Sequence, residues 1–173
     1  MNETIQNMIE RRSVRKYKNQ QIKDAELELI IKAGEYAPTG RGVQSPIMVV
    51  IQDQETIQKL SKLNAQVMGV DSDPFYGAPT VIVVLADRTK QTCIEDGSLV
   101  MGNLMNAAYS LGVDSCWIHR AYEVFESDEG KALLRKWDIQ GDYRGIGHCL
   151  LGYHEGDYPQ AKARKQDYVY YVK

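Results

Sequence analysis

The sequence predicts one domain in which helices flank a β-sheet, and three observations support this α/β or α+β fold class. Short runs of β-branched and other apolar residues alternate with longer segments that have helical periodicity. The chain of 173 residues is 43% hydrophobic, which is sufficient for one core without disulfides or a structural metal. No internal repeat or linker divides it, so residues 1–173 are expected to form a single domain.

Two helices are expected in the first part of the chain. Apolar residues at positions 5, 8 and 9 have helical spacing, with Asn2 or Thr4 as candidate N-cap, and this helix is expected to end near Ser13. Asp24 is the expected N-cap of a second helix. Pro38 should end this helix, because helical backbone is disfavoured just before a proline.

The middle of the chain is expected to supply two strands and a helix. A glycine-rich loop at residues 39–46 leads into residues 47–51, which are mostly β-branched and predict a buried strand. Asp53 is placed to cap the helix that follows, and a loop at residues 69–79 comes after it. Residues 81–85 form the clearest buried strand of the sequence.

The second half of the chain continues the alternation. Residues 95–111 have helical periodicity with small residues that allow close packing, and residues 113–119 predict a strand. Ser127 is placed to cap another helix, and residues 147–153 predict the last strand. After Gly156 the chain is polar, basic and rich in tyrosine, so this tail is expected to pack against another surface such as a second subunit.

Composition argues against several classes of function. Basic and acidic residues number 21 and 23, so the net charge of -2 provides no overall attraction to nucleic acid or to an anionic membrane. Three widely spaced cysteines favour neither a disulfide framework nor a zinc site. The first residues lack the apolar stretch of a signal peptide, and the longest strongly apolar run, residues 81–86, is too short to span a bilayer. A cytoplasmic protein is therefore expected.

The densest basic cluster follows the first predicted helix and contains Arg11, Arg12, Ser13 and Arg15. If the chain is extended there, Arg11, Ser13 and Arg15 lie on one face, because side chains of extended backbone alternate. Two guanidiniums and a hydroxyl would then suit a phosphate monoester. Cations also favour a helix C-terminus without binding anything, and composition alone favours this second interpretation.

A second basic group, Lys162, Arg164 and Lys165, lies in the tail. Alone it is typical of a solvated segment. Taken together with the N-terminal cluster, it suggests a phosphate clamp formed by the two ends of the chain.

The loop between the second helix and the first strand is a candidate for contact with a flat ligand. Its glycines allow close approach of the backbone, and Gln44 could form a hydrogen bond to the edge of a heterocycle. An ordinary connection between a helix and a strand explains the same residues equally well.

Common catalytic motifs are absent from the sequence. No Gly-x-Gly-x-x-Gly follows a predicted strand, no Walker-type loop is present, and the three histidines lack the spacing of helical metal ligands. Cys116 lies in an apolar stretch, which is more typical of a buried core residue than of a nucleophile. A thiol redox protein that uses Cys116 is retained as an alternative.

Four segments, in order along the chain, resemble the nitroreductase family. Residues 11–17, Arg-Arg-Ser-Val-Arg-Lys-Tyr, resemble the opening signature of that family. Residues 37–46 resemble its Ala-Pro-Ser/Thr loop, which ends in Gln-x-Pro and here has Ser45 at the middle position. Residues 107–118 resemble a later helix and the strand that contacts flavin, and Gly152 and Tyr153 with the basic tail resemble the closing segment.

The resemblance implies an α+β fold with a mixed β-sheet flanked by helices, in an intertwined homodimer with FMN at the subunit interface. Arg11, Ser13 and Arg15 would hold the FMN phosphate and ribityl chain, while Lys162 and Arg164 would close over the phosphate. The residues implied in cofactor binding are Arg11, Arg12, Ser13, Arg15, Pro38, Thr39, Gly40, Gln44, Asn64, Cys116, Trp117, Ile118, Lys162 and Arg164. Those of the loop that starts at Pro38 would come from the partner subunit.

The resemblance also implies a function that needs no catalytic acid, nucleophile or metal, because flavin carries the chemistry. Hydride would pass from NADH or NADPH through FMN to a small electron-poor acceptor, such as a nitro compound or a quinone, by a ping-pong mechanism. Residues 69–79 and 120–127 form short connections where larger members of the family build helices over the active site. The alternatives are a dehalogenase-like, enone-reducing or dehydrogenating reaction on the same fold, or FMN binding without catalysis.

Overall fold

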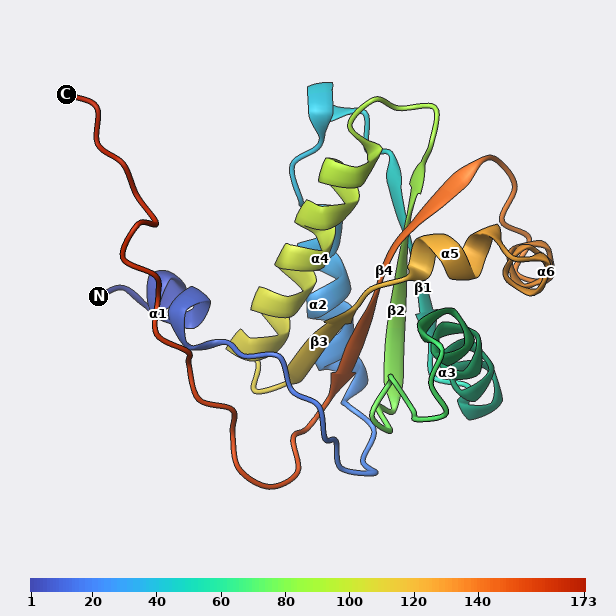
Figure 1. Ribbon diagram of the computed structural model, residues 1–173, viewed down its shortest axis with the longest axis horizontal. Coiled ribbons are helices and arrows are strands. Elements are labelled where there is room, and N and C mark those ends of the chain that lie inside the picture. The colour runs from blue at the N-terminus through green and yellow to red at the C-terminus, as the bar shows by residue number, and fades with distance from the viewer.

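The structure is a computed structural model that describes residues 1–173, and it consists of a four-stranded sheet between two groups of helices (Figure 1). The strands are β1 (Pro46–Ile51), β2 (Thr80–Asp87), β3 (Asp114–Ile118) and β4 (Tyr143–Gly152). The helices are α1 (Glu3–Glu10), α2 (Asp24–Glu35), the short 3-10 helix η1 (Gly40–Gly42), α3 (Gln54–Met68), α4 (Cys93–Ser110), α5 (Ala121–Glu126) and α6 (Asp128–Lys136). The structure is α+β, as predicted.

Both faces of the sheet are buried against helices. Its strand order is β1-β2-β4-β3, and neighbouring strands are antiparallel. Along β2, Val81 and Val83 pack toward α3 and α5, whereas Ile82 and Val84 pack toward α2 and α4. Because successive side chains point to opposite faces, a strand buried on both sides must be apolar throughout. A mixed sheet was expected, but the pairs of strands are all antiparallel. Parallel pairing is limited to an isolated bridge between Ser13 and Ser115.

The predicted N-caps are mostly confirmed. The side chain of Asn2 accepts a hydrogen bond from the Ile5 amide at 3.0 Å, and those of Asp53 and Ser127 cap α3 and α6 in the same manner. The expectation for Asp24 was wrong, because Lys23 is the N-cap and Asp24 is the first residue of α2. An acidic residue is still favourable there, since it faces the positive end of the helix dipole.

Three further features differ from the sequence-based expectation: the end of α1, the burial of β1 and the start of β4. Helix α1 ends at Glu10 rather than near Ser13, because the chain is already extended at Arg11. Strand β1 is at the edge of the sheet, so only Ile51 is buried where a fully buried strand was expected. Strand β4 begins at Tyr143, before the expected start, because its ladder with β2 continues past an irregularity after Val84.

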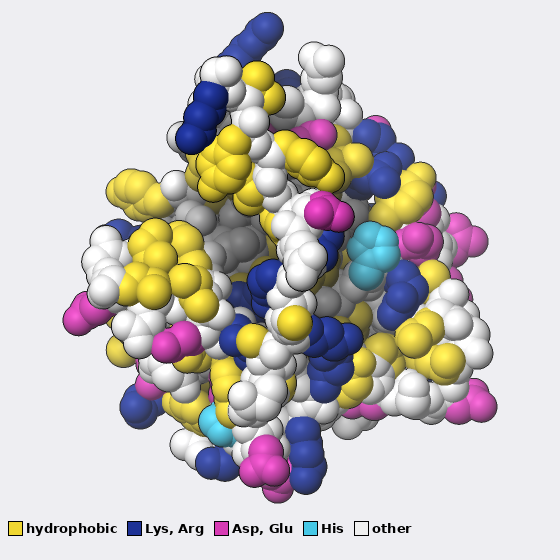
Figure 2. Space-filling view, turned by 60° about the vertical axis from the view of Figure 1, so that its left-hand side comes forward, with side chains coloured by type: hydrophobic (Ala, Val, Ile, Leu, Met, Phe, Trp, Pro, Cys, Tyr) yellow, Lys and Arg dark blue, Asp and Glu magenta, His cyan; other side chains and the backbone are white.

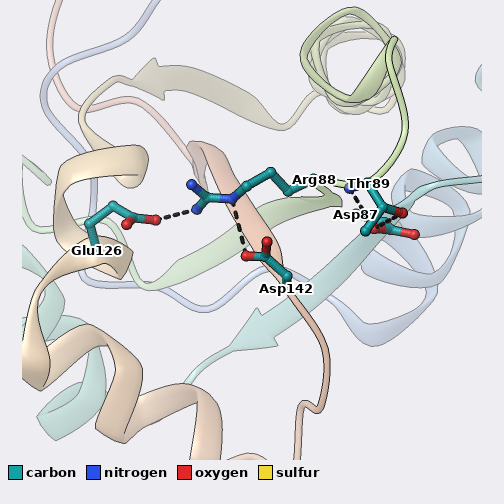
Figure 3. A network of polar contacts seen from close by, with 5 residues as sticks. All are labelled: Asp87, Arg88, Thr89, Glu126 and Asp142. Atoms are coloured by element: carbon teal, nitrogen blue, oxygen red, sulfur yellow. Dashed lines mark hydrogen bonds and ion pairs between the residues drawn. The ribbon is translucent and has the colours of Figure 1, made fainter.

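The segment expected to be a short connection after β3 contains helix α5. An ion-pair network, shown in Figure 3, joins the end of this helix to the chain just after β2 and just before β4, the two central strands of the sheet. Arg88 follows β2 and forms ion pairs with Glu126 at the end of α5 and with Asp142 just before β4, the latter at 3.1 Å. No helix of the structure combines the length and the apolar character needed to cross a membrane.

Candidate phosphate and cofactor site

The segment after α1 is extended, as the phosphate hypothesis required. Its backbone lies along the free edge of β3, where the Val14 amide donates to the Ser115 carbonyl at 3.0 Å. Val14 is 2% exposed and Tyr17 is also buried, so these two side chains anchor the segment in the core. The Tyr17 hydroxyl donates back to the Val14 carbonyl at 3.0 Å. Buried anchors therefore fix the backbone on which the basic side chains are carried.

The three side chains predicted to converge lie close to one thiol. Burial raises the pKa of Cys116, while the guanidiniums of Arg15 and Arg11 and the hydroxyl of Ser13 act in the opposite direction. Because the extended segment pairs with β3 at the Ser13–Ser115 bridge, Arg11, Ser13 and Arg15 are carried along the edge of the strand that ends with Ile118. The thiol itself is 1% exposed, and its raised pKa keeps it protonated at neutral pH, which disfavours the thiol redox alternative.

Several polar groups of this cluster have no partner in the chain. The Nη1 atom of Arg11, the Nε atom of Arg12 and the hydroxyl of Ser115 are buried without a hydrogen bond. No carboxylate lies within ion-pair distance of Arg11, Arg12 or Arg15. Buried polar groups without partners are unfavourable, so this cluster fits an added anion with several oxygens, such as a phosphate. Figure 2 shows a hollowed face of the molecule with Lys and Arg side chains gathered about its middle.

The loop after α2 is held by a buried carboxylate that the sequence analysis missed. Asp96, 2% exposed in the first turn of α4, accepts hydrogen bonds from the Gly40 amide at 2.8 Å and from the Ser45 hydroxyl at 3.0 Å. The Thr92 hydroxyl also donates to it at 3.0 Å. A side chain at position 40 would place its Cβ 2.4 Å from the Thr92 hydroxyl oxygen, so glycine is required there. An acidic residue in a helical turn that faces the core was the available sequence signal.

Pro38, Thr39 and Gln44 line a surface hollow of about 770 Å³ between this loop and helices α2 and α4. Gln44 has a φ of 51°, and its backbone amide donates to the Thr39 hydroxyl at 3.1 Å. No hydrogen bond or ion pair joins this loop to the segment that carries Arg11 and Arg15. Within one chain the two candidate regions are therefore separate.

Asn64 has both ends of its side-chain amide engaged. It is fully buried on α3, donates to the His119 carbonyl at 2.7 Å and accepts from Arg120 Nε at 3.2 Å. These bonds join α3 to the turn after β3. A contact between Asn64 and a flavin would require one of them to be exchanged.

Lys162 and Arg164 are exposed, and neither forms a hydrogen bond or an ion pair in the chain. The tail that carries them extends away from the sheet and passes α1 in Figure 1. It ends in exposed apolar side chains, Tyr168, Val169, Tyr170, Tyr171 and Val172. No group of three or more His, Cys, Asp or Glu side chains is arranged to hold a metal ion.

Comparison with known proteins identifies the family. Residues 8–74 and 68–153 match the model of the Nitroreductase family. The chain belongs to the nitroreductase family. This nitroreductase-family chain is 32% identical over 141 residues to a protein of Archaeoglobus fulgidus provisionally named NADH dehydrogenase/NAD(P)H nitroreductase, with 79% of this chain and 76% of the relative covered.

Two solved nitroreductases with bound FMN have the same fold. The enzyme of Bacteroides fragilis superposes with a TM-score of 0.92 at 25% identity, and that of Desulfitobacterium hafniense with a TM-score of 0.89 at 26% identity. In both cases all of this chain and all of the other chain are covered.

Proposed function

We propose that this chain is an FMN-dependent oxidoreductase that transfers hydride from NADH or NADPH to a small electron-poor acceptor, such as a nitro compound or a quinone. The observation that carries the proposal is the set of unpartnered groups on the extended N-terminal segment, with Arg11, Ser13 and Arg15 near one strand and no carboxylate to neutralise them. Membership of the nitroreductase family and FMN in two similar solved structures support the same conclusion.

In this proposal, Arg11, Ser13 and Arg15 bind the phosphate and ribityl chain of FMN, and Arg12 continues the basic surface. Guanidinium groups suit this task because they form paired, charge-assisted hydrogen bonds with phosphate oxygens. The backbone of residues 116–118 runs beside the isoalloxazine ring. Lys162 and Arg164 would close over the phosphate.

A homodimer completes the proposed site. The loop residues Pro38, Thr39, Gly40 and Gln44 are separate from the phosphate segment within one chain, and a partner subunit would bring them to the flavin. Helix α1 exposes Ile5, Met8 and Ile9, and the tail exposes further apolar side chains. Exposed apolar groups of this extent are typical of a surface that becomes covered.

Bound FMN supplies the hydride-transfer chemistry, so the chain needs no acid or nucleophile of its own. Its residues bind the phosphate, orient the ring and keep one ring face accessible. The dinucleotide and the acceptor would occupy that face in turn, which is the basis of the proposed ping-pong kinetics. The absence of a catalytic motif in the sequence agrees with this division of tasks.

The visible spectrum of the purified protein with FMN, recorded before and after anaerobic addition of NADH or NADPH, tests the proposal. We expect bound flavin whose absorbance is bleached by the dinucleotide and restored by a nitro compound or quinone, with parallel lines in initial-rate plots. Bound FMN that neither dinucleotide bleaches would favour the non-catalytic alternative. Fast turnover of an enone or a halogenated compound, with slow nitro reduction, would favour another reaction of the same fold. Protein that does not bind FMN would overturn the proposal.

A further inference from the structure

The extended N-terminal segment has a second neighbour besides β3, namely the chain just after β4. The Lys18 amide donates to the Tyr153 carbonyl at 2.8 Å, and the Glu155 amide donates to the Lys16 carbonyl at 3.0 Å. An isolated antiparallel bridge lies between these two bonds. The backbone near Arg15 is therefore held by two parts of the sheet that are far from it in sequence.

Tyr158 extends this support to the backbone between the first two arginines. Its hydroxyl accepts a hydrogen bond from the Arg12 amide at 3.0 Å. The chain has left helix α1 at Arg11, and the Arg12 amide makes no backbone hydrogen bond. The phenol thus fixes the peptide that joins Arg11 to Arg12.

The Tyr158 ring is itself held from two sides. It stacks on Tyr109 of α4 with ring centroids 6.1 Å apart, and it meets the His154 ring edge-on at 5.4 Å. His154 is fixed in turn by Asp114, the first residue of β3, whose carboxylate lies 3.0 Å from the His154 amide and 2.7 Å from its Nδ1 atom. Asp114 is 7% exposed, so this support starts in the core.

The turn that contains these residues also faces the basic cluster. Arg15 lines a hollow of about 390 Å³ together with His154, Glu155, Gly156, Asp157 and Pro159, the neighbours of Tyr158 in this turn. The Arg12 amide and its acceptor Tyr158 are 146 positions apart in the sequence, so no local preference of either segment creates the contact.

We propose that Tyr158 is a positioning residue for the phosphate-binding segment. Its hydroxyl, held by Tyr109 and His154, fixes the Arg12 peptide so that Arg11 and Arg15 are directed at the same anion. The identity of that anion as the FMN phosphate rests on the proposed function. The positioning of the backbone does not depend on it.

The test compares FMN with riboflavin, which has the same ring and ribityl chain but no phosphate. Tyr158→Phe keeps the ring stacking and removes only the hydrogen-bond acceptor. We expect its Kd for FMN, measured by quenching of flavin fluorescence, to rise about fivefold, the effect of one neutral hydrogen bond. The Kd for riboflavin should rise less, because riboflavin contacts the segment only through its ribityl chain. Tyr143→Phe is the matched control, because Tyr143 lies at the start of β4, away from the N-terminal segment, and its hydroxyl forms no hydrogen bond, so it should alter neither Kd.

Amide hydrogen exchange of residues 11–15 in flavin-free protein provides a readout that does not need a ligand. We expect faster exchange at Arg12 in Tyr158→Phe and wild-type exchange in Tyr143→Phe. Unchanged exchange, or equal losses of affinity for FMN and riboflavin, would overturn the positioning role. Wild-type protein that binds neither flavin would overturn the proposed function, while the exchange result would still decide whether Tyr158 positions the segment.

Discussion

Arg88 at the end of β2 and Arg11 at the end of α1 are both partly buried, yet their surroundings are opposite. Arg88 is neutralised within the chain by Glu126 and Asp142 (Figure 3), so its charge joins α5 to the sheet. Arg11 has no carboxylate near it and keeps a buried nitrogen without a partner. The charge of Arg88 is balanced within the chain, although its buried Nε atom makes no hydrogen bond, whereas the charge of Arg11 has no balancing group in the chain and suits an added anion.

The same contrast separates two other parts of the molecule. The carboxylate of Asp96 receives hydrogen bonds from three groups and fixes the loop after α2. The side chain of His148, fully buried in β4, has no hydrogen-bond partner within ordinary distance and lies between the rings of Phe75 and Phe125. Satisfied polar groups in this protein support the fold, and unsatisfied ones indicate either ligand binding or sensitivity to pH.

The largest effect is expected from Asp96→Ala, which leaves three donors without an acceptor. We expect a loss of roughly 3–5 kcal/mol in the free energy of unfolding, the usual range when a buried charged partner is removed. Chemical denaturation followed by tryptophan fluorescence measures it. Glu95→Ala, at an exposed position one residue earlier, is the control and should change stability by less than about 0.5 kcal/mol. Similar losses in both variants would mean that the loop anchor is not the cause.

Acid should destabilise the protein through His148. Burial lowers the pKa of His148 from 6.5 to about 4, so between these values the unfolded chain binds a proton that the folded chain does not. The stability contribution is complete above pH 6.5, decreases as the pH falls toward 4, and amounts to roughly 3 kcal/mol. His148→Phe keeps a ring between Phe75 and Phe125. Denaturation at pH 4.5 and pH 7 should show a smaller acid-induced loss in this variant than in wild type, and equal losses would contradict the assignment.

Arg11 and Arg15, which have no carboxylate partner, should matter for binding rather than for folding. We expect Arg11→Ala and Arg15→Ala each to weaken FMN binding by roughly 1.5–3 kcal/mol, the range for a hydrogen bond to a charged group. Titration of flavin-free protein measures this change. Stability without FMN should stay near the wild-type value, because no ion pair is lost. Unchanged FMN affinity in both variants would contradict the assigned phosphate site.

Arg88→Ala should have the smallest effect, and it should change stability rather than FMN binding. We expect a loss of about 1 kcal/mol in stability, because its ion pairs are partly exposed and screened by solvent. FMN affinity should be unchanged. A variant that folds normally but binds FMN poorly would remove the distinction between the Arg88 network and the Arg11 cluster.

Much of the local structure was predictable because its causes are close together in sequence. Asn2, Asp53 and Ser127 cap their helices through amides three residues away, and β2 was recognisable from an apolar run that is buried on both faces of the sheet. The extended exit from α1, with basic residues on alternate positions, was also visible. Errors occurred where partners were distant: the edge position of β1 and the extension of β4 depend on strand pairing.

Local sequence was therefore sufficient for the alternation of helices and strands, for most caps and for the existence of a basic segment that could bind phosphate. Which charges remain available for a ligand was decided by tertiary contacts. Arg88 meets Glu126 across 38 positions, Gly40 meets Asp96 across 56, and Arg12 meets Tyr158 across 146. The physical reason is that neutralisation of a charge depends on distance in space, and only the folded chain determines which residues are brought within hydrogen-bonding range.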